Sequence, residues 1–320
     1  MERNLAWVVL PDGNSITTLK VDINSFLQDK ELLSQSPKWI HLRGVDGKAE
    51  ELLTTHFNIN ELSLEDCRTE GRSKVEVFDD YIFILMIYFD GGIVRQKKLC
   101  IFWGKDFIIT VGSRRLFEEA RKTLSLEEEP FGQGIEKILW IISSIVADKF
   151  KEITDVLEEQ ADEVEARVFK EQNPELLEDI SDLSFEILTL RRTLKQLRDT
   201  YKSLLSSSPR FINHENVHYF RDLLDEISIL YDRAETLHEF IQNVLSVFSS
   251  LVSFKLNDIM KTLTILITIL EPLMLISSFY GMNVEDLPLA HSPYGILFIL
   301  SVMLGASLTF LFFFRKKGWI

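Results

Sequence analysis

The sequence predicts an α+β membrane protein with an N-terminal cytoplasmic α/β domain, long stalk helices and two C-terminal transmembrane helices. Three observations predict this class. Strand-like runs of β-branched and aromatic residues fill the first 111 residues, and no Pro or Gly interrupts residues 211–271. Two long apolar segments then close the chain.

The first 134 residues are expected to form the α/β domain. Strands are predicted at residues 6–10, 38–42, 74–78, 81–89, 99–103 and 107–111, and helices near residues 48–56, 61–66 and 114–124. The triplet Asp90-Gly91-Gly92 predicts a hairpin turn. A break containing Pro and Gly at residues 127–134 ends the domain.

Helices are expected from residue 135 onward. A helical hairpin over residues 135–213 has Pro174 at the first turn of its second helix, where no backbone N–H is needed. A stalk helix over residues 214–258 then continues directly into the first apolar segment. So long a helix buries little by itself, so we expect it to pack against partners.

Two segments are long and apolar enough to cross a bilayer. Residues 262–280 contain one charged side chain, Glu271, and residues 294–314 contain none. We therefore predict transmembrane helices at 259–281 and 294–314, joined by an outer loop at 282–293 and followed by a basic tail at 315–320.

The distribution of charge predicts the orientation. Lys255 and Lys261 precede the first apolar segment, 262–280, and the basic tail follows the second, whereas the connecting loop carries Glu285 and Asp286 and no Lys or Arg. Basic residues concentrate on the cytoplasmic side of membrane proteins. We therefore expect a multi-pass protein of the cell (inner) membrane with both termini in the cytoplasm.

Net charge and motifs exclude several classes of function. The chain carries −14 overall, and because residues 259–320 carry +1, residues 1–258 carry −15. Such an acidic domain disfavours nucleic acid as a partner and favours cations. The sequence contains no phosphate-binding glycine motif and no signature of covalent catalysis, so we expect neither nucleotide binding nor enzyme activity.

A polar stripe with a spacing of seven residues runs along the predicted stalk and first span. Its members are Asn243, Ser250, Asn257, Thr264, Glu271 and Ser278, and the seam beside it comprises Ser246, Ser253, Met260, Ile267 and Met274. Unsatisfied polar groups in hydrocarbon cost several kcal/mol each, so the stripe is expected to face a shared interior. The alternative is that each hydroxyl bonds its own helix backbone or a neighbouring helix. Two spans cannot enclose a pore, so several copies must meet around an axis.

The triplet Gly281-Met282-Asn283, directly after Tyr280 and the first span, closely resembles the CorA family of divalent-cation channels. Further similar segments are Leu64-Glu65-Asp66, Lys74-Val75-Glu76, Tyr219-Phe220-Arg221-Asp222 and Met260-Lys261-Thr262-Leu263-Thr264, so the resemblance covers essentially the whole chain. It implies a funnel-shaped homopentamer whose first span lines the pore.

The resemblance also implies passive, potential-driven uptake of hydrated Mg²⁺, with Co²⁺ and Ni²⁺ as further candidate cargoes. The implied selectivity filter is Gly281, Met282 and Asn283: Asn283 would contact the hydrated ion, and Gly281 would allow a left-handed turn. The implied pore lining is Asn257, Met260, Leu263, Thr264, Ile267, Glu271, Met274 and Ser278, with a hydrophobic constriction at Met260 and Leu263. A zinc-selective or exporting relative, or a non-conducting membrane-anchored sensor, remains an alternative.

Regulation by cytoplasmic divalent cations is implied at Asp90 and Asp222. Two carboxylates that face each other across a subunit interface repel until a cation bridges them, so binding would favour the closed assembly. The alternative is that each is a solvated surface charge.

Glu271 departs from the family pattern, in which an apolar residue, typically methionine, precedes the proline. Pro272 has no N–H and releases the carbonyl of Thr268, so the two residues predict a second cation site near mid-membrane. The alternative is a protonated glutamate hydrogen-bonded between neighbouring helices without touching ions.

Overall fold

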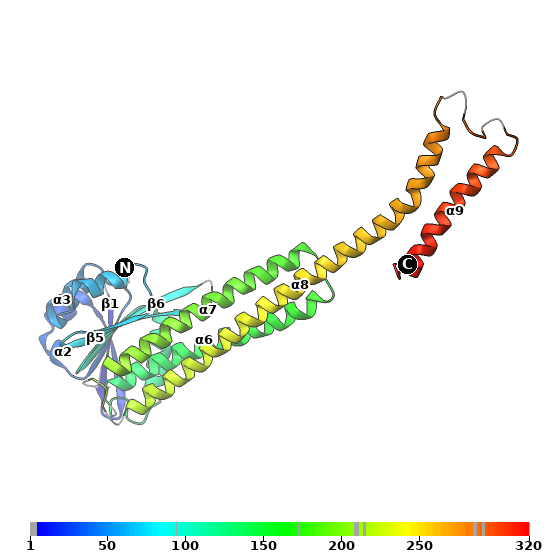
Figure 1. The fold of residues 1–320 in the computed structure, drawn as a ribbon. Helices are drawn as coiled ribbons and strands as arrows, with labels where there is room; N and C mark the ends of the chain where they lie inside the picture. Colours follow the sequence, from blue (N-terminus) through cyan, green and yellow to red (C-terminus); the bar gives the residue numbers. More distant parts are fainter. Residues whose placement is uncertain are drawn as a thin grey trace. The chain divides into compact units, whose positions relative to one another are not determined.

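The computed structural model describes residues 5–93, 95–132, 134–171, 173–207, 211–213, 216–283, 287–289 and 292–319. A seven-stranded mixed sheet lies in the N-terminal part of the chain (Figure 1). Its strands are β1 (Leu5–Asp12), β2 (Ser15–Asp22), β3 (Lys38–Leu42), β4 (Lys74–Val77), β5 (Tyr81–Phe89), β6 (Gln96–Gly104) and β7 (Phe107–Val111). They are ordered β2-β1-β3-β7-β6-β5-β4, and only β3 and β7 are paired in parallel.

One face of the sheet forms a core with four helices: α1 (Ile23–Gln28), α2 (Lys30–Ser34), α3 (Lys48–Phe57) and α4 (Glu61–Arg68). Because side chains alternate along a strand, Tyr81, Phe83 and Leu85 of β5 all point into this core. The hydroxyl of Tyr81 accepts a hydrogen bond from the backbone N–H of Asn60 at 3.0 Å. That bond attaches the start of α4 to β5, the strand next to the β4 edge of the sheet.

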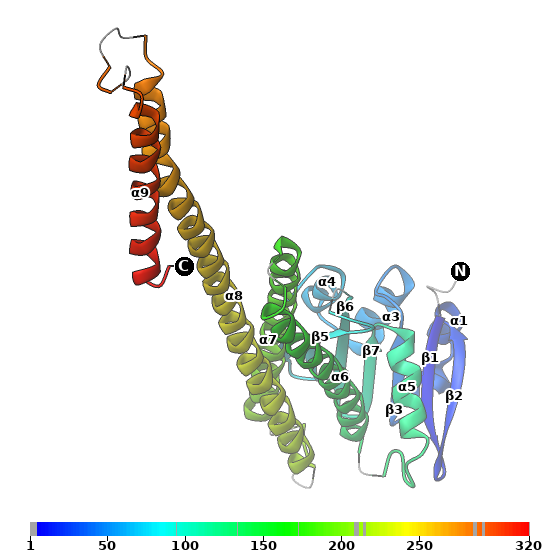
Figure 2. The same cartoon turned by 90° about the vertical axis from the view of Figure 1, so that its right-hand side faces the viewer.

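The opposite face packs against α5 (Arg114–Leu124), α6 (Glu136–Val168) and α7 (Pro174–Ser207), which Figure 2 shows beside the strands. Ile82, Ile84 and Met86 of β5 are buried on this side. Tyr201 of α7 is also buried, and its hydroxyl donates a hydrogen bond to Sδ of Met86 at 3.3 Å. The sheet is thus covered on both faces.

The long helix α8 (Val217–Tyr280) begins in this domain, where its side chains contact α6 and α7. The ring of Phe220 stacks on Trp103 of β6, with 6.3 Å between ring centroids. Arg233 forms ion pairs with Asp155 at 2.6 Å and Glu158 at 2.7 Å, both on α6. These contacts supply the partners that the sequence predicts for the stalk.

The six predicted strands and the three predicted helices of the α/β domain are confirmed, as is the hairpin turn that begins at Asp90. The strand β2 and the helices α1 and α2 are not among the predictions. β2 is a partly exposed edge strand, SITTLKVD, without a clear alternation of polar and apolar residues. α1 and α2 have only six and five residues, too few for a helical period to show.

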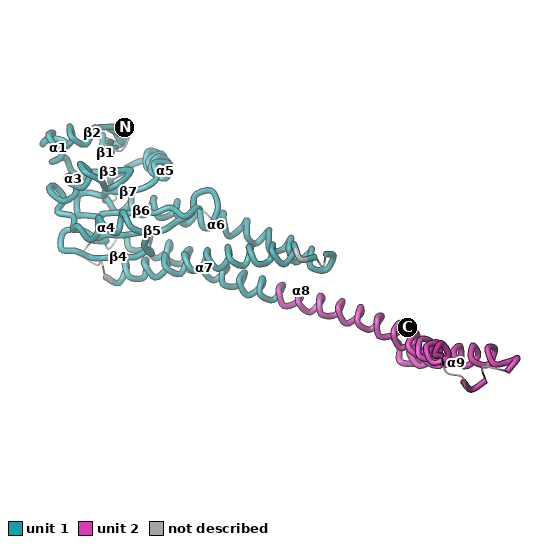
Figure 3. The backbone as a smooth tube through the Cα atoms, turned by 90° about the horizontal axis from the view of Figure 1, so that it is seen from above, with its two compact units in different colours: residues 1–244 teal, residues 245–320 magenta. Residues whose placement is uncertain are grey.

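The chain divides into two compact units, Met1–Val244 and Leu245–Ile320 (Figure 3). The second unit contains the rest of α8, with Pro272 inside the helix, and α9 (Gly295–Lys316). Both helices are long and apolar enough to cross a membrane. The predicted acidic loop residues Glu285 and Asp286 lie outside the described residues.

Candidate functional site

The apolar part of α8 has one partly shielded face. The shielded residues are Lys261, Ile265, Thr268, Ile269, Pro272, Leu273, Ile276 and Tyr280. The helix α9 has a matching face, made of Gly295, Ile299, Met303, Ala306, Ser307, Phe310 and Phe314. Both sets follow the three-four spacing of a single helix face, as expected where two helices of one unit cover each other.

The predicted pore-lining residues lie on the uncovered side of α8. At about 100° per residue, the stripe of Thr264, Glu271 and Ser278 lies about 130° around the helix from the centre of the shielded face. The seam that contains Met260 and Met274 lies about 170° away. These two methionines are 60% and 62% exposed in the single chain. Neither the stripe nor the seam is therefore covered by α9.

Some hydroxyls of the stripe bond their own helix. Thr264 Oγ1 donates to the carbonyl of Met260 at 2.8 Å, and Ser250 Oγ donates to the carbonyl of Ser246 at 2.9 Å. The alternative stated for individual hydroxyls therefore holds for Thr264 and Ser250 in the single chain. Glu271 is exposed, and its carboxylate is the one charge among residues 262–280.

The predicted filter residues follow α8 at once, but Gly281 does not adopt the predicted left-handed conformation, since it is absent from the residues with positive φ. A Cβ at Gly281 would instead lie 3.2 Å from the carbonyl oxygen of Ser277, closer than an ordinary contact. A side chain at this position would therefore have to shift the last helical turn by a few tenths of an ångström. Asn283 is exposed, and the next described residue is Leu287.

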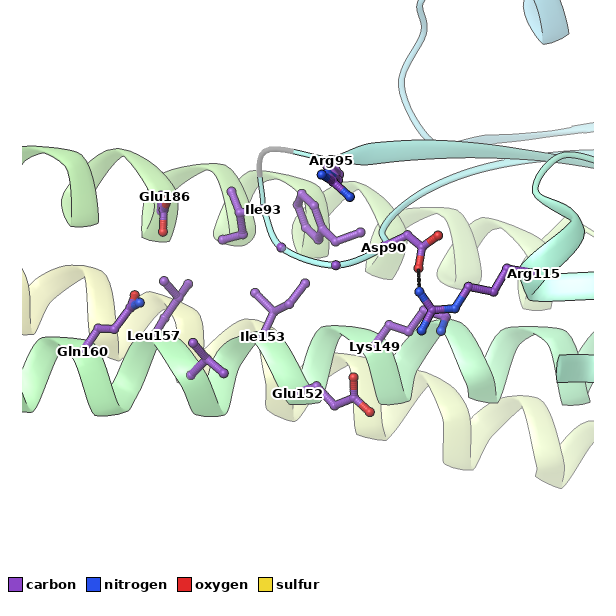
Figure 4. A pocket seen from close by; sticks show the side chains of 14 residues that line it. Asp90, Ile93, Arg95, Arg115, Lys149, Glu152, Ile153, Leu157, Gln160 and Glu186 are labelled. Atoms are coloured by element: carbon purple, nitrogen blue, oxygen red, sulfur yellow. Dashed lines mark ion pairs between the residues drawn. The ribbon is translucent and has the colours of Figure 1, made fainter.

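Asp90 lies at the end of β5 beside a cavity of about 530 Å³ between the β5–β6 turn and helices α6 and α7 (Figure 4). Its side chain is 15% exposed, and Oδ1 lies 3.2 Å from Nη1 of Arg115 on α5. Arg95, Lys149, Glu152 and Glu186 also line this cavity. The carboxylate therefore has an arginine partner within its own chain.

Asp222 is exposed on α8 and lines a different cavity, of about 350 Å³. Asp225, Glu226, Lys151 and Arg233 line the same cavity. Burial, together with the nearby charge of Asp148, raises the pKa of Glu226. The structure therefore does not bring Asp90 and Asp222 together within one chain, and no group of three or more His, Cys, Asp or Glu among the described residues could hold a metal ion.

Two residues of these sites are not among the sequence predictions. Glu226 stands one helical turn after Asp222, so the i, i+4 spacing already carries the signal for an acidic pair. Arg115 carries no such signal. It follows Asp90 by 25 residues, and only the packing of α5 beside the β5–β6 turn brings the two side chains together.

The fold is that of a membrane protein, because an N-terminal α/β domain is followed by two apolar helices long enough to cross a bilayer. The model of the family described as "CorA-like Mg2+ transporter protein" matches residues 34–316. The chain belongs to this family.

Individual relatives match this chain over nearly its full length. The chain is 28% identical over 313 residues to the cobalt/magnesium transport protein CorA of Thermotoga maritima, covering 93% of this chain and 87% of the relative. It is also 28% identical over 323 residues to the protein of the same name from Methanocaldococcus jannaschii, covering 98% and 99%. The complete structure of the M. jannaschii CorA magnesium transporter shares the fold, with a TM-score of 0.81, 24% identity and 99% of each chain covered.

Proposed function

We propose that this chain carries hydrated divalent cations passively across a membrane, driven by the membrane potential. The main proposed activity is Mg²⁺ uptake, with Co²⁺ and Ni²⁺ as further candidate cargoes. The observation that carries the proposal is the uncovered face of α8, together with the triplet Gly281-Met282-Asn283 that follows the helix directly. Two relatives named as cobalt/magnesium transport proteins support the choice of cargo.

The proposed pore is a ring of α8 helices from several copies of the chain, five in our proposal, with α9 outside them against lipid. The second span is apolar on every side, which suits a helix in contact with lipid. The uncovered face of α8 is long and carries both polar and apolar groups, which suits a water-filled interior. Two spans from one chain cannot enclose such a pore.

Residues along the proposed pore have different roles. The amide oxygen of Asn283 contacts the water shell of the ion at the outer mouth, because Mg²⁺ releases its waters reluctantly. Asn257 contributes a second polar ring nearer the cytoplasm. Between these rings, Met260 and Leu263 form an apolar collar that stops conduction when it loses water.

Cytoplasmic divalent cations are proposed to close the pore by binding at Asp222. Asp225 and Glu226 lie in the same cavity and add negative charge, and burial, together with the charge of nearby Asp148, raises the pKa of Glu226. A divalent cation shared with the neighbouring copy relieves this repulsion and holds the subunits together.

Flux into proteoliposomes tests the function. The purified chain is reconstituted, a negative-inside potential is imposed, and entry of Mg²⁺, Co²⁺, Ni²⁺ and Zn²⁺ is followed with indicator dyes. Entry of Mg²⁺ that depends on the potential supports the proposal. Entry of Zn²⁺ alone favours a zinc-selective relative, and no entry of any ion favours a non-conducting sensor.

The proposed location is the inner membrane with both termini in the cytoplasm. Cysteine scanning tests this orientation in whole cells with an impermeant thiol reagent. A cysteine at Glu285 should react and a cysteine at Ser206 should not, and the reverse pattern would overturn the orientation.

A further inference from the structure

We propose that Glu271 forms a cation-binding site in the middle of the pore, which holds a divalent cation and thereby excludes monovalent ions. The inference rests on the proposed function, because it requires α8 to line an ion pathway. It assigns the site that selects divalent over monovalent cations to a residue distinct from the Gly281-Met282-Asn283 triplet.

The position of Glu271 requires an explanation. It is the central residue of the 19-residue segment 262–280 and carries the only charge there. A carboxylate at that depth is strongly unfavourable in lipid, so it has to face protein or water. The partly shielded face of α8 does not include Glu271, which is exposed in the single chain. The interior shared with other copies is the environment that remains.

Pro272 adds a second oxygen at this level. It has no backbone N–H, so the carbonyl of Thr268, one turn earlier, loses its helical donor. That carbonyl points along the helix toward the level of Glu271, but Thr268 and Pro272 lie on the partly shielded face, about 60° or more around the helix from Glu271, so the oxygen stands beside the carboxylate and does not face the axis. Carboxylate and carbonyl oxygens are the ligands that hard divalent cations prefer, directly or through their waters.

Repetition by symmetry makes the site selective. Each copy of the chain contributes one carboxylate at the same depth, so several negative charges surround a narrow axis. Such charges repel one another until cations enter, and a divalent cation compensates more charge in one place than a monovalent ion does. Without divalent cations the same ring attracts monovalent cations and lets them pass.

Block of Na⁺ flux by Mg²⁺ measures occupancy of this site. The full-length protein in proteoliposomes is loaded with a chelator, Na⁺ entry is recorded, and Mg²⁺ is then added outside in steps. We expect Na⁺ to enter without Mg²⁺ and to be blocked as Mg²⁺ rises. Glu271→Gln, which keeps the shape and removes the charge, should raise the half-blocking Mg²⁺ concentration by about tenfold or more.

Matched variants separate charge from structure. Glu271→Asp keeps the carboxylate and should stay within about threefold of the parent. Glu271→Met is a second neutral variant and should behave like Glu271→Gln, so the test does not depend on the folding of a single variant. Pro272→Ala restores the backbone N–H that bonds the carbonyl of Thr268, and it should raise the half-blocking Mg²⁺ concentration by less than Glu271→Gln does. Ser301→Ala is on α9, outside the proposed ring, where the Ser301 hydroxyl donates to the carbonyl of Leu297 in its own helix, and it should leave the block unchanged. Size-exclusion chromatography checks assembly of each variant.

Three results of these flux measurements would contradict the inference. Equal half-blocking concentrations for the parent and an assembled neutral variant would overturn it and would favour a glutamate hydrogen-bonded between helices. Absence of Mg²⁺-sensitive Na⁺ entry in the parent would overturn it too, while Mg²⁺ entry in the same vesicles would leave the proposed function standing. Absence of both Na⁺ and Mg²⁺ entry would remove the proposed function and the inference together.

Discussion

Nη1 of Arg115 lies 3.2 Å from Oδ1 of Asp90, so the carboxylate expected to bind a regulatory cation already pairs with a cation of its own chain. The two side chains differ in exposure, at 73% for Arg115 and 15% for Asp90. A metal ion that binds Asp90 therefore has to displace an arginine that can move into solvent. The regulatory part assigned to Asp90 depends on this exchange.

Arg115→Gln should make regulation more sensitive to Mg²⁺. With the guanidinium removed, less Mg²⁺ is needed to protect the cytoplasmic domain from protease, by up to about fivefold, because partly exposed ion pairs contribute at most about 1 kcal/mol. Limited proteolysis over a Mg²⁺ series measures the midpoint. Arg95→Gln is the matched control, since Arg95 lines the same cavity and loses the same charge. An unchanged midpoint in Arg115→Gln would remove Asp90 from the regulatory site.

Asp222→Lys should abolish protection by Mg²⁺. The substitution places a positive charge where the cation is proposed to bind, so Mg²⁺ no longer changes the rate of proteolysis. Asp232→Lys serves as the control, because Asp232 is also exposed on α8 but lines another cavity. If Asp222→Lys keeps the Mg²⁺-dependent protection of the parent, the cation binds elsewhere.

Asn283→Ala should reduce Mg²⁺ flux by about tenfold or more, because one substitution removes an oxygen from every copy in the ring. Flux into proteoliposomes measures the loss, and chromatography shows whether the oligomer persists. Asn283→Gln keeps an amide oxygen and should retain more flux than alanine does. Full flux from an assembled Asn283→Ala protein would place the outer filter at another residue.

Gly281→Ala should also lower flux, by about threefold or more, since the added Cβ meets the carbonyl oxygen of Ser277 at 3.2 Å and has to displace the turn that carries Asn283. Gly305→Ala is the control within the same unit. No atom lies within 4 Å of a Cβ at Gly305, and alanine favours the helix. Equal flux from Gly281→Ala and Gly305→Ala would show that the close approach does not position the filter.

Acid should destabilise the α/β domain through His41, which is 1% exposed and stacks on Phe117 with 4.4 Å between ring centroids. Burial, with smaller contributions from Arg43 and Arg114, lowers the pKa of His41 to about 3. The folded state therefore keeps His41 neutral, whereas the unfolded chain takes up a proton below about pH 6.5. The contribution of His41 to the free energy of unfolding is fully present above that pH. It falls as pH decreases toward 3, and the loss is about 2 kcal/mol at pH 5.

Urea unfolding of the full-length protein at pH 7.5 and pH 5 measures this effect. Tryptophan fluorescence follows the unfolding, and two of the five tryptophans, Trp7 and Trp39, pack against His41 or Phe117. For His41→Gln, the free energy of unfolding should differ much less between pH 7.5 and pH 5 than it does for the parent. A parent-like pH dependence in His41→Gln would assign the acid sensitivity to other groups.

Local features of the chain predict much of this protein. The two spans, the long helix α8, the polar stripe and the Gly-Met-Asn triplet all depend on residues close together in sequence, so composition and helical period are enough to find them. The same period shows that Thr264, Glu271 and Ser278 share one face. The short helices and the edge strand β2 carry too little periodic signal to be predicted.

Tertiary structure alone decides the features that join distant residues. The parallel pairing of Lys38–Leu42 with Phe107–Val111 and the ion pair of Asp90 with Arg115 cannot be read from local pattern. The helical period predicts the faces of α8, but only its packing with α9 decides which of them is covered. Pairing and coverage depend on how elements pack in three dimensions, and the free energy of that packing is shared among residues that the sequence keeps far apart.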